Sequence, residues 1–260
     1  MNEASEWRLP IQDALEKMTR KELDGDVFLR SMMHHPSWLV PGRHGARGLE
    51  LGVITTPKGR ILEVYSDEDA LARMERQSGS EFTGELVRLE GHDLFASLAA
   101  LQVDRLNLNP GQEPKLSWRA EQIDLLVAWG RQAKVELALL EPERVRDPVG
   151  TIAAYDGYYL VYERNEDTHS IVLAPDSRGR SLAAVFTSWD SVEAFRASMQ
   201  SEASGVLETV EFSAKELFPL IQRLDVQGLV FNPWSLIPAR ALSVALLSEI
   251  IPRTEQPHLH

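Results

Sequence analysis

Apolar residues fall into short blocks along the chain, separated by polar segments that contain glycine and proline. Strand-length blocks rich in β-branched and aromatic residues predict strands, and apolar residues three or four positions apart predict helices. In the first half, a helix is expected at 26–34, followed by strands at 37–40, 49–55, 60–65, 84–89 and 105–108. A helix should follow each of the last three strands, and the final one covers 117–129.

The second half repeats this order of elements. Strands are expected at 158–163, 169–174, 180–187, 206–211 and 228–231, and terminal helices at 149–154 and 238–250. The clearest repeat pairs LQVDRLNLNPG at 101–111 with LDVQGLVFNPW at 224–234. Because the whole succession recurs with only small shifts, we predict two tandem copies of one domain.

Each predicted copy has the order β-β-β-α-β-α-β-α, so we expect an α+β fold with helices packed on a mixed sheet. The first copy covers 1–130 and includes an N-terminal helix, and the second covers 149–260. Residues 131–148 between them are expected to form a linker or a strand, because Pro142 and Pro148 flank a charged stretch.

Polar residues mark where the predicted elements begin and end. Asn109-Pro110 and Asn232-Pro233 should end the repeated strand, because proline removes a ladder donor and asparagine binds nearby backbone in an Asx turn. Capping-box spacing predicts helix starts at Ser66 with Asp69, at Thr187 with Asp190, and at Ser213 with Glu216.

Composition excludes several classes of function. The chain has 39 acidic and 27 basic residues, which argues against nucleic-acid binding because that affinity rests on lysine and arginine. It has no cysteine, so disulfides, thiol nucleophiles and thiolate metal sites are excluded. No segment has the apolar length of a membrane span or the pattern of a signal peptide, so we expect a cytoplasmic protein without membrane association.

Several segments resemble one protein family. They are LPIQDALEKM, DVFLRSMMHHPSWLVPG, GRILEVYSDEDALARM, LFASLAALQVDRLNLNPG and EQIDLLVAW. Together they resemble the N-terminal domain of the SseB (enhanced serine sensitivity) family, over residues 9–130. The usual C-terminal domain of that family does not align with 150–260, where the first half is repeated instead. The resemblance implies proteins with no established catalytic residues, labelled as secretion-associated, with related domains among candidate immunity proteins of bacterial toxin systems.

Catalytic, cofactor and metal sites find no support in the motifs. No nucleophile elbow, Walker sequence or G-x-G-x-x-G occurs, so we predict no catalytic residue and no cofactor. The glycine-rich PGRHGARG at 41–48 is expected to be a flexible loop rather than an anion site. No metal is predicted, because metal-ligand spacing is missing among the histidines considered, His34, His35, His44 and His92.

The candidate partner-binding residues are Trp118, Trp189, Trp234, Asp67, Glu68 and Asp69. Trp234 follows Asn-Pro in a loop, Trp118 follows the corresponding loop of the first half, and Trp189 begins a helix. Each of these tryptophans belongs either to the core or to an interface, where tryptophan is enriched. The acidic run falls in a first helical turn, where the helix dipole favours carboxylates.

Three functions remain open from the sequence. We favour a non-catalytic cytoplasmic protein-binding protein, either toxin-neutralising (immunity) or secretion-associated, whose acidic surface recognises a basic toxin or secretion component. The second is an enzyme or small-molecule sensor with a ligand cleft between the copies, which would bring together Asn109, Asn232, Arg60 and Arg180. The third is a structural scaffold or homo-oligomer.

Overall fold

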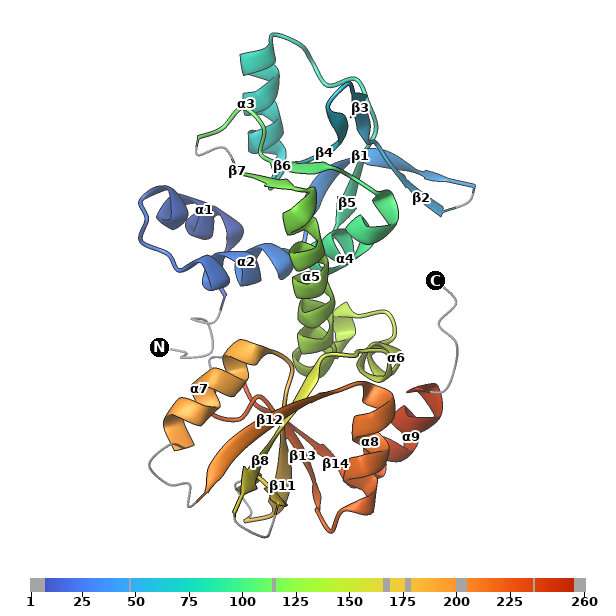
Figure 1. Cartoon of the computed structure of the whole chain (residues 1–260). Helices are drawn as coiled ribbons and strands as arrows, with labels where there is room; N and C mark the ends of the chain where they lie inside the picture. Colours follow the sequence, from blue (N-terminus) through green and yellow to red (C-terminus); the bar gives the residue numbers. More distant parts are fainter. Residues whose placement is uncertain are drawn as a thin grey trace. The chain divides into compact units, whose positions relative to one another are not determined.

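Strands of mixed direction lie at the centre of each half of the chain (Figure 1). The computed structural model describes residues 8–46, 48–113, 116–165, 169–175, 179–199, 205–235 and 237–254. The chain divides into two compact units, Met1–Ala133 and Lys134–His260, which we call unit 1 and unit 2. Each unit has a main hydrophobic core of its own, and the predicted α+β class is confirmed.

Unit 1 begins with two helices and continues with alternating strands and helices. Its helices are α1 (Ile11–Thr19), α2 (Gly25–Met33), α3 (Glu68–Ser78) and α4 (Gly91–Leu101). Its strands are β1 (Trp38–Gly45), β2 (Gly48–Leu51), β3 (Ile54–Thr56), β4 (Gly59–Val64), β5 (Leu86–Leu89), β6 (Arg105–Leu108) and β7 (Leu116–Arg119). Helix α5 (Ala120–Leu140) begins in unit 1 and ends in unit 2.

Unit 2 continues after α5 with a short 3-10 helix, Pro142–Arg144. Its remaining helices are α6 (Pro148–Ala153), α7 (Trp189–Met199), α8 (Ala214–Arg223) and α9 (Val244–Thr254). Its strands are β8 (Tyr158–Arg164), β9 (His169–Ile171), β10 (Leu173–Pro175), β11 (Ser181–Phe186), β12 (Val206–Phe212), β13 (Gly228–Phe231) and β14 (Arg240–Ser243).

One pair of parallel strands lies at the centre of each unit. In unit 2 the strand order is β12-β8-β11-β13-β14, where β11 and β13 are parallel, and β9 and β10 pair with β8 and β11. In unit 1, β5 pairs with β1, and β4 pairs in parallel with β6, which pairs with β7. A bridge between Leu39 and Tyr65 joins β1 to the end of β4, so the order becomes β5-β1-β4-β6-β7.

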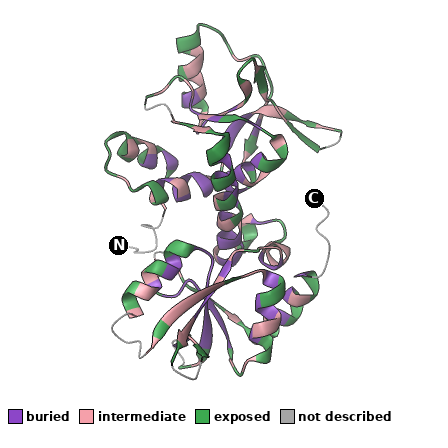
Figure 2. Cartoon of the chain, in the orientation of Figure 1, coloured by how far each residue is buried: buried purple, intermediate pink, exposed green. Residues whose placement is uncertain are grey.

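Alternate residues of the central strands face two different layers of helices. In β8, Tyr158 and Leu160 belong to the main core with α6, α8, α9 and the end of α5, whereas Val161 belongs to a small core with α7. Figure 2 shows the central strands of unit 2 largely buried and α7 exposed on its outer side. In unit 1, α3 covers a corresponding small core that contains Leu39 and Tyr65.

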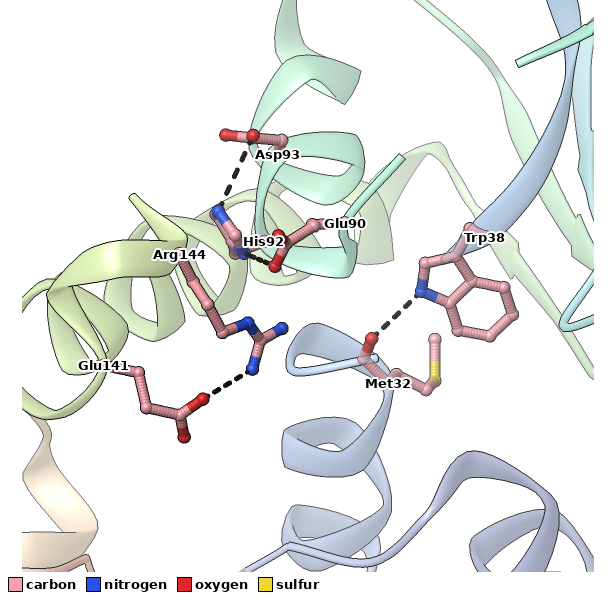
Figure 3. Close-up of polar contacts among 7 residues, drawn as sticks. All are labelled: Met32, Trp38, Glu90, His92, Asp93, Glu141 and Arg144. Carbon is pink, nitrogen blue, oxygen red and sulfur yellow. Dashed lines mark hydrogen bonds and ion pairs between the residues drawn. The ribbon is translucent and has the colours of Figure 1, made fainter. Parts of the chain in front are cut away.

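The main core of unit 1 is anchored by a buried tryptophan. Trp38 is fully buried, and its indole N–H donates to the carbonyl of Met32 at 3.1 Å (Figure 3). Its ring meets Phe95 of α4 edge to face at 6.0 Å. The contact joins β1 to α2 and α4, and satisfies the indole donor inside the core.

Two kinds of predicted element, the second strand and the closing helix, are wrong in detail in both halves. The expected second strand of each half is two strands, because β2 pairs with β1 while β3 pairs with β4, and β9 and β10 divide in the same way. The expected closing helices start later, because 116–119 and 240–243 pair with the preceding strand as β7 and β14. The observed order therefore has more strands than the predicted β-β-β-α-β-α-β-α.

Residues 131–148 form neither the predicted linker nor a strand. Residues 131–140 are the second part of α5, and Pro142 begins a 3-10 helix. Helix α5 continues through Gly130. This glycine packs closely against α4, where a Cβ atom would approach the backbone nitrogen of Ala96 to 2.6 Å. The apolar residues after it pack into the main core of unit 2 as helix, and Pro142 ends the run.

A buried asparagine joins the ends of the two parallel strands in each unit, and we call this contact the asparagine latch. In unit 1, the side-chain oxygen of Asn109 accepts from the backbone N–H of Ser66 at 2.8 Å, and its amide donates to the Ser66 hydroxyl at 2.9 Å. In unit 2, Asn232 makes the same two bonds to Thr187, both at 2.9 Å. The latch spans 43 residues in unit 1 and 45 in unit 2, so the predicted local Asx turn is wrong.

Because of the latch, the helix that follows begins one residue later than the capping-box spacing predicts. The hydroxyls of Ser66 and Thr187 are bound to asparagine, so the next residue in each case caps the helix. Asp67 accepts from the backbone N–H of Ala70 at 2.6 Å, and Ser188 accepts from that of Ser191 at 3.2 Å. The third predicted capping box, at Ser213, is confirmed.

We predict that the latch contributes substantially to stability. Asn232→Gly tolerates the backbone φ of 50° at this position but removes both side-chain bonds and leaves the N–H of Thr187 buried without its partner. The free energy of unfolding should fall by about 2–4 kcal/mol, measured by urea denaturation. As a control, Asn107→Ala removes an exposed hydrogen bond to Ser117 and should change the free energy of unfolding by less than about 0.5 kcal/mol. Equal effects of the two substitutions would contradict a structural role for the latch.

Candidate functional site

Two exposed tryptophans follow the carboxyl ends of the parallel strands in unit 2. Trp189 comes two residues after Thr187, and Trp234 comes two residues after Asn232, so the latch joins the segments that carry them. Their exposed fractions are 48% and 49%, and the other described tryptophans are buried or half-buried. The structure thus presents two large aromatic side chains to solvent at one end of the central strands.

The two tryptophans lie on opposite flanks of α7. Trp189 is the first residue of α7, and its ring meets Tyr159 of β8 edge to face at 5.8 Å. Trp234 follows β13, and its ring lies 5.6 Å from that of Phe195 in α7. Strands β8 and β13 are the two neighbours of β11, so the aromatic contacts fall on either side of the helix.

The backbone at Trp234 has a left-handed conformation. Its φ is 54°, in the region that a bulky side chain rarely adopts and that costs about 1–2 kcal/mol. Gly111 has the corresponding place after Asn109-Pro110 in unit 1, with a φ of 87°. The strained position therefore carries glycine in unit 1 and tryptophan in unit 2, and such strain often accompanies a function.

Three exposed carboxylates lie on the elements that carry Trp189 or pair with the strand of Tyr159. Asp190 and Glu193 are exposed on α7, and Glu211 is exposed on β12 directly opposite Tyr159. Partial burial of the phenol, and then the charge of Glu211, raise the pKa of Tyr159 above its usual value. We name the set of Trp189, Trp234, Tyr159, Asp190, Glu193 and Glu211 the tryptophan surface.

Trp118 does not join this surface. It lies in β7 of unit 1 opposite Leu106, and it is half-buried against the main core of that unit. Of the two interpretations open from the sequence, core packing therefore describes Trp118. Exposure distinguishes Trp189 and Trp234 from it.

The acidic run lies at the start of α3, with Glu68 and Asp69 in the first turn as expected. Asp67 caps the helix and also accepts from the side-chain amide of Gln12, while Glu68 forms an exposed ion pair with Arg88. Asp69 is exposed. Asp67 thus has a structural role, and the run belongs to unit 1 whereas the tryptophan surface belongs to unit 2.

The predicted glycine-rich loop is wrong. Residues 41–45 continue β1 as a hairpin with β2, and Arg43 is ion-paired with Glu50 at 2.9 Å rather than free to hold an anion. Arg47 lies outside the described residues. An open hollow of about 570 Å³ lies beside this hairpin, lined mainly by apolar and glycine residues that include Leu51, Ile54 and Phe82.

The histidines have separate surroundings. His34 is buried, His35 has Nε2 at 3.0 Å from the carbonyl of Ser66, and His44 is exposed on β1. His92 is buried with its ring nitrogens 3.6 Å from carboxylate oxygens of Glu90 and Asp93 (Figure 3). Within the part of the chain that the structure describes, no group of three or more ligands is arranged to hold a metal ion.

Three of the four residues considered for a ligand cleft are engaged elsewhere or exposed. Asn109 and Asn232 are buried, and each is held in the latch of its own unit. The backbone N–H of Arg60, an exposed residue, donates to Asp104 at 2.7 Å. None of the helices in the described ranges is long and apolar enough to cross a membrane.

Four residues of the tryptophan surface, Tyr159, Asp190, Glu193 and Glu211, were not among the partner-binding residues predicted from the sequence. Tyr159 and Glu211 lie in separate strands, and only the register of β8 with β12 places them opposite one another. The alternation in each strand predicts which side chains share a face but not which strand lies beside which.

Comparison with known proteins adds little to this geometry. No protein family matches the chain, and no curated protein matches it. Among solved structures, the chain is similar to Anabaena Tic22, described as a protein of protein transport, with 8% sequence identity and a TM-score of 0.22. The likeness covers 76% of this chain and 86% of that one, and at this TM-score it supports no inference. Membership of the SseB family stays a prediction from the sequence.

We predict that the tryptophans differ sharply in their contribution to folding. Trp118→Ala should lower the free energy of unfolding by about 3 kcal/mol, because it opens a gap against the core. Trp234→Gly should change the free energy of unfolding by less than about 1 kcal/mol, because glycine relieves the strain of the positive φ and this offsets the lost contact with Phe195. Urea denaturation of both variants measures the difference, and a large loss in Trp234→Gly would identify that residue as part of the core.

Proposed function

We propose that the chain is a non-catalytic protein-binding protein whose partner covers the tryptophan surface of unit 2. The observation that carries this proposal is the pair of exposed tryptophans, Trp189 at the start of α7 and Trp234 against Phe195 of α7, the second in a strained backbone conformation. Exposed tryptophans contribute little to a core but are enriched among the residues that dominate binding energy at interfaces. A partner that buries both rings would also desolvate the strained loop.

We further propose that the two units are copies of one domain. Support comes from the same order of five strands, from one parallel pair in each unit, and from the two asparagine latches. Under this proposal Trp189 corresponds to Glu68, and Trp234 corresponds to Gly111. The duplicated framework would therefore carry the binding surface on unit 2 only.

The chemistry of the surface favours a basic partner. The chain has a formal net charge of −12, and Asp190, Glu193 and Glu211 lie beside the aromatic rings. A lysine or arginine of the partner would meet both a carboxylate and the face of a tryptophan, where cation–π attraction contributes about 0.5–2 kcal/mol. Together with the resemblance to SseB-type domains, this supports a role as an immunity protein for a basic toxin, or as a companion of a secretion component, in the cytoplasm.

Exchanging residues between the units tests the proposal. The double variant Trp189→Glu with Trp234→Gly gives unit 2 the residues found at the corresponding positions of unit 1, and the latch stays intact. We expect a tagged chain to co-purify from its native cells with one stoichiometric basic protein. The double variant should lose that protein at least about thirtyfold, because the loss of a single hot-spot tryptophan already costs about 2 kcal/mol or more of binding free energy. Quantitative mass spectrometry of the purified complexes measures the loss.

The matched control changes the equivalent surface of unit 1. Glu68→Lys with Asp69→Lys reverses exposed charges but leaves Asp67 to cap α3. This variant should retain the partner if the tryptophan surface binds it. Retention by the tryptophan variant and loss by the lysine variant would refute the proposed surface and assign binding to the acidic run.

A further inference from the structure

The longest sheet edge of unit 2 lies beside the tryptophan surface. Strand β12, Val206–Phe212, is the outermost strand of the sheet and, among the described residues, pairs with β8 alone (Figure 1). Val206 is 57% exposed, and Glu211 on the same strand belongs to the tryptophan surface. Strands β5, β7 and β14, which also lie at the end of a strand order, have four residues each, against seven in β12.

Hydrogen bonds of β8 identify the backbone groups of β12 that face outward. The carbonyl of Val161 accepts from the N–H of Val172, on the side of β8 away from β12. Thr209 is the partner of Val161 in the antiparallel register, so their pair lacks direct backbone bonds and the N–H and C=O of Thr209 point to the open edge. The backbone N–H and C=O groups of Leu207 and Glu211, two residues away on either side, also point to the open edge.

The outward groups and the tryptophan surface share one face of the sheet. The side chains of Leu207, Thr209 and Glu211 lie on the α7 face, since Leu207 packs in the small core under α7 and Glu211 is opposite Tyr159. A strand added to β12 would place alternate side chains on this same face. A basic side chain opposite Glu211 would then meet that carboxylate next to Tyr159 and Trp189.

Strand β12 lacks three of the features that usually prevent an edge from pairing, namely proline, lysine and a bulge. Its sequence, VLETVEF, contains no proline and no lysine, and its ladder with β8 runs without a bulge from Val206 to Phe212. Its charged residues are both acidic, and one of them, Glu208, is already bound by Arg164 and Tyr162. Glu211 is exposed and has the outward backbone groups beside it.

We propose that β12 binds an extended basic segment of the partner protein as an additional antiparallel strand of the sheet. This inference rests on the proposed function and names the form in which the partner binds: main-chain bonds to Leu207, Thr209 and Glu211, with arginine or lysine side chains toward the tryptophan surface. A second copy of this chain fits the edge less well, because it would bring two further glutamates, Glu208 and Glu211, to the same short ladder.

Labelled synthetic peptides of the length of β12 test the proposal directly. The probe alternates arginine with valine, so that one face carries only arginine. A matched probe has the same side chains but N-methyl groups on the amides that would face β12, and a third carries glutamate in place of arginine. Fluorescence anisotropy with the full chain should show binding of the first probe, and at least about tenfold weaker binding of the other two, because strand addition needs those main-chain bonds and the opposite charge.

Two substitutions at one position provide the control within the chain. Thr209→Pro removes an outward N–H without removing a bond to β8, and should weaken the arginine probe at least about tenfold. Thr209→Val keeps that N–H and loses only a hydroxyl that has no hydrogen-bond partner among the described residues, so affinity should stay within about twofold of the original. The N-methylated probe keeps the test decisive even where Thr209→Pro perturbs the fold.

Specific results would overturn strand addition. Equal affinity of the N-methylated and unmodified arginine probes would assign binding to side chains alone. Suppose that the partner is lost in the tryptophan variant but is bound equally well by Thr209→Pro and Thr209→Val. That result would refute strand addition while the proposed function stands. A wild-type dimer that Thr209→Pro converts to a monomer would make β12 an interface between copies and likewise refute a partner strand.

Discussion

The buried asparagine at the end of the central strand holds each unit together at the point where three elements meet. Its side chain satisfies the backbone N–H of the residue that leads from the first parallel strand into a helix, Ser66 or Thr187. An N–H left unpaired at such a buried position would cost about 1–3 kcal/mol, so helix, strand and following turn depend on one amide. The positive φ of Asn109 and Asn232 then turns the chain out of the sheet.

The tryptophan surface lies on this framework but contributes little to its stability. Trp189 and Trp234 follow the latch residues by two positions, so the latch fixes the chain just before each of them while their side chains remain exposed. Where unit 2 has these tryptophans, unit 1 has Glu68 and Gly111, so one arrangement of strands supports two different surfaces. A rigid framework with variable residues at the ends of its strands is a common way for proteins to separate stability from recognition.

Charge and sheet geometry act together on the proposed partner. Glu211 lies at the open edge of β12, opposite the phenol of Tyr159, whose pKa is raised by partial burial and by that carboxylate. The acidic side chains favour a basic strand and disfavour a second copy of the same edge. Affinity would come from main-chain bonds and buried rings, whereas the choice of partner would come from charge.

Local pattern alone determined the α+β class, most strands, the capping box at Ser213 and the helical first turn at Asp67, because these follow from side-chain periodicity and from polar groups a few residues apart. The absence of cysteine was likewise a matter of sequence alone. Tertiary structure decided that Asn232 binds Thr187, 45 residues away, and that Glu211 lies opposite Tyr159. It also decided that α5 continues through 131–140, where a linker or a strand was expected. These features depend on strand register and on which core buries a segment, and neither is encoded in the period of one stretch of chain.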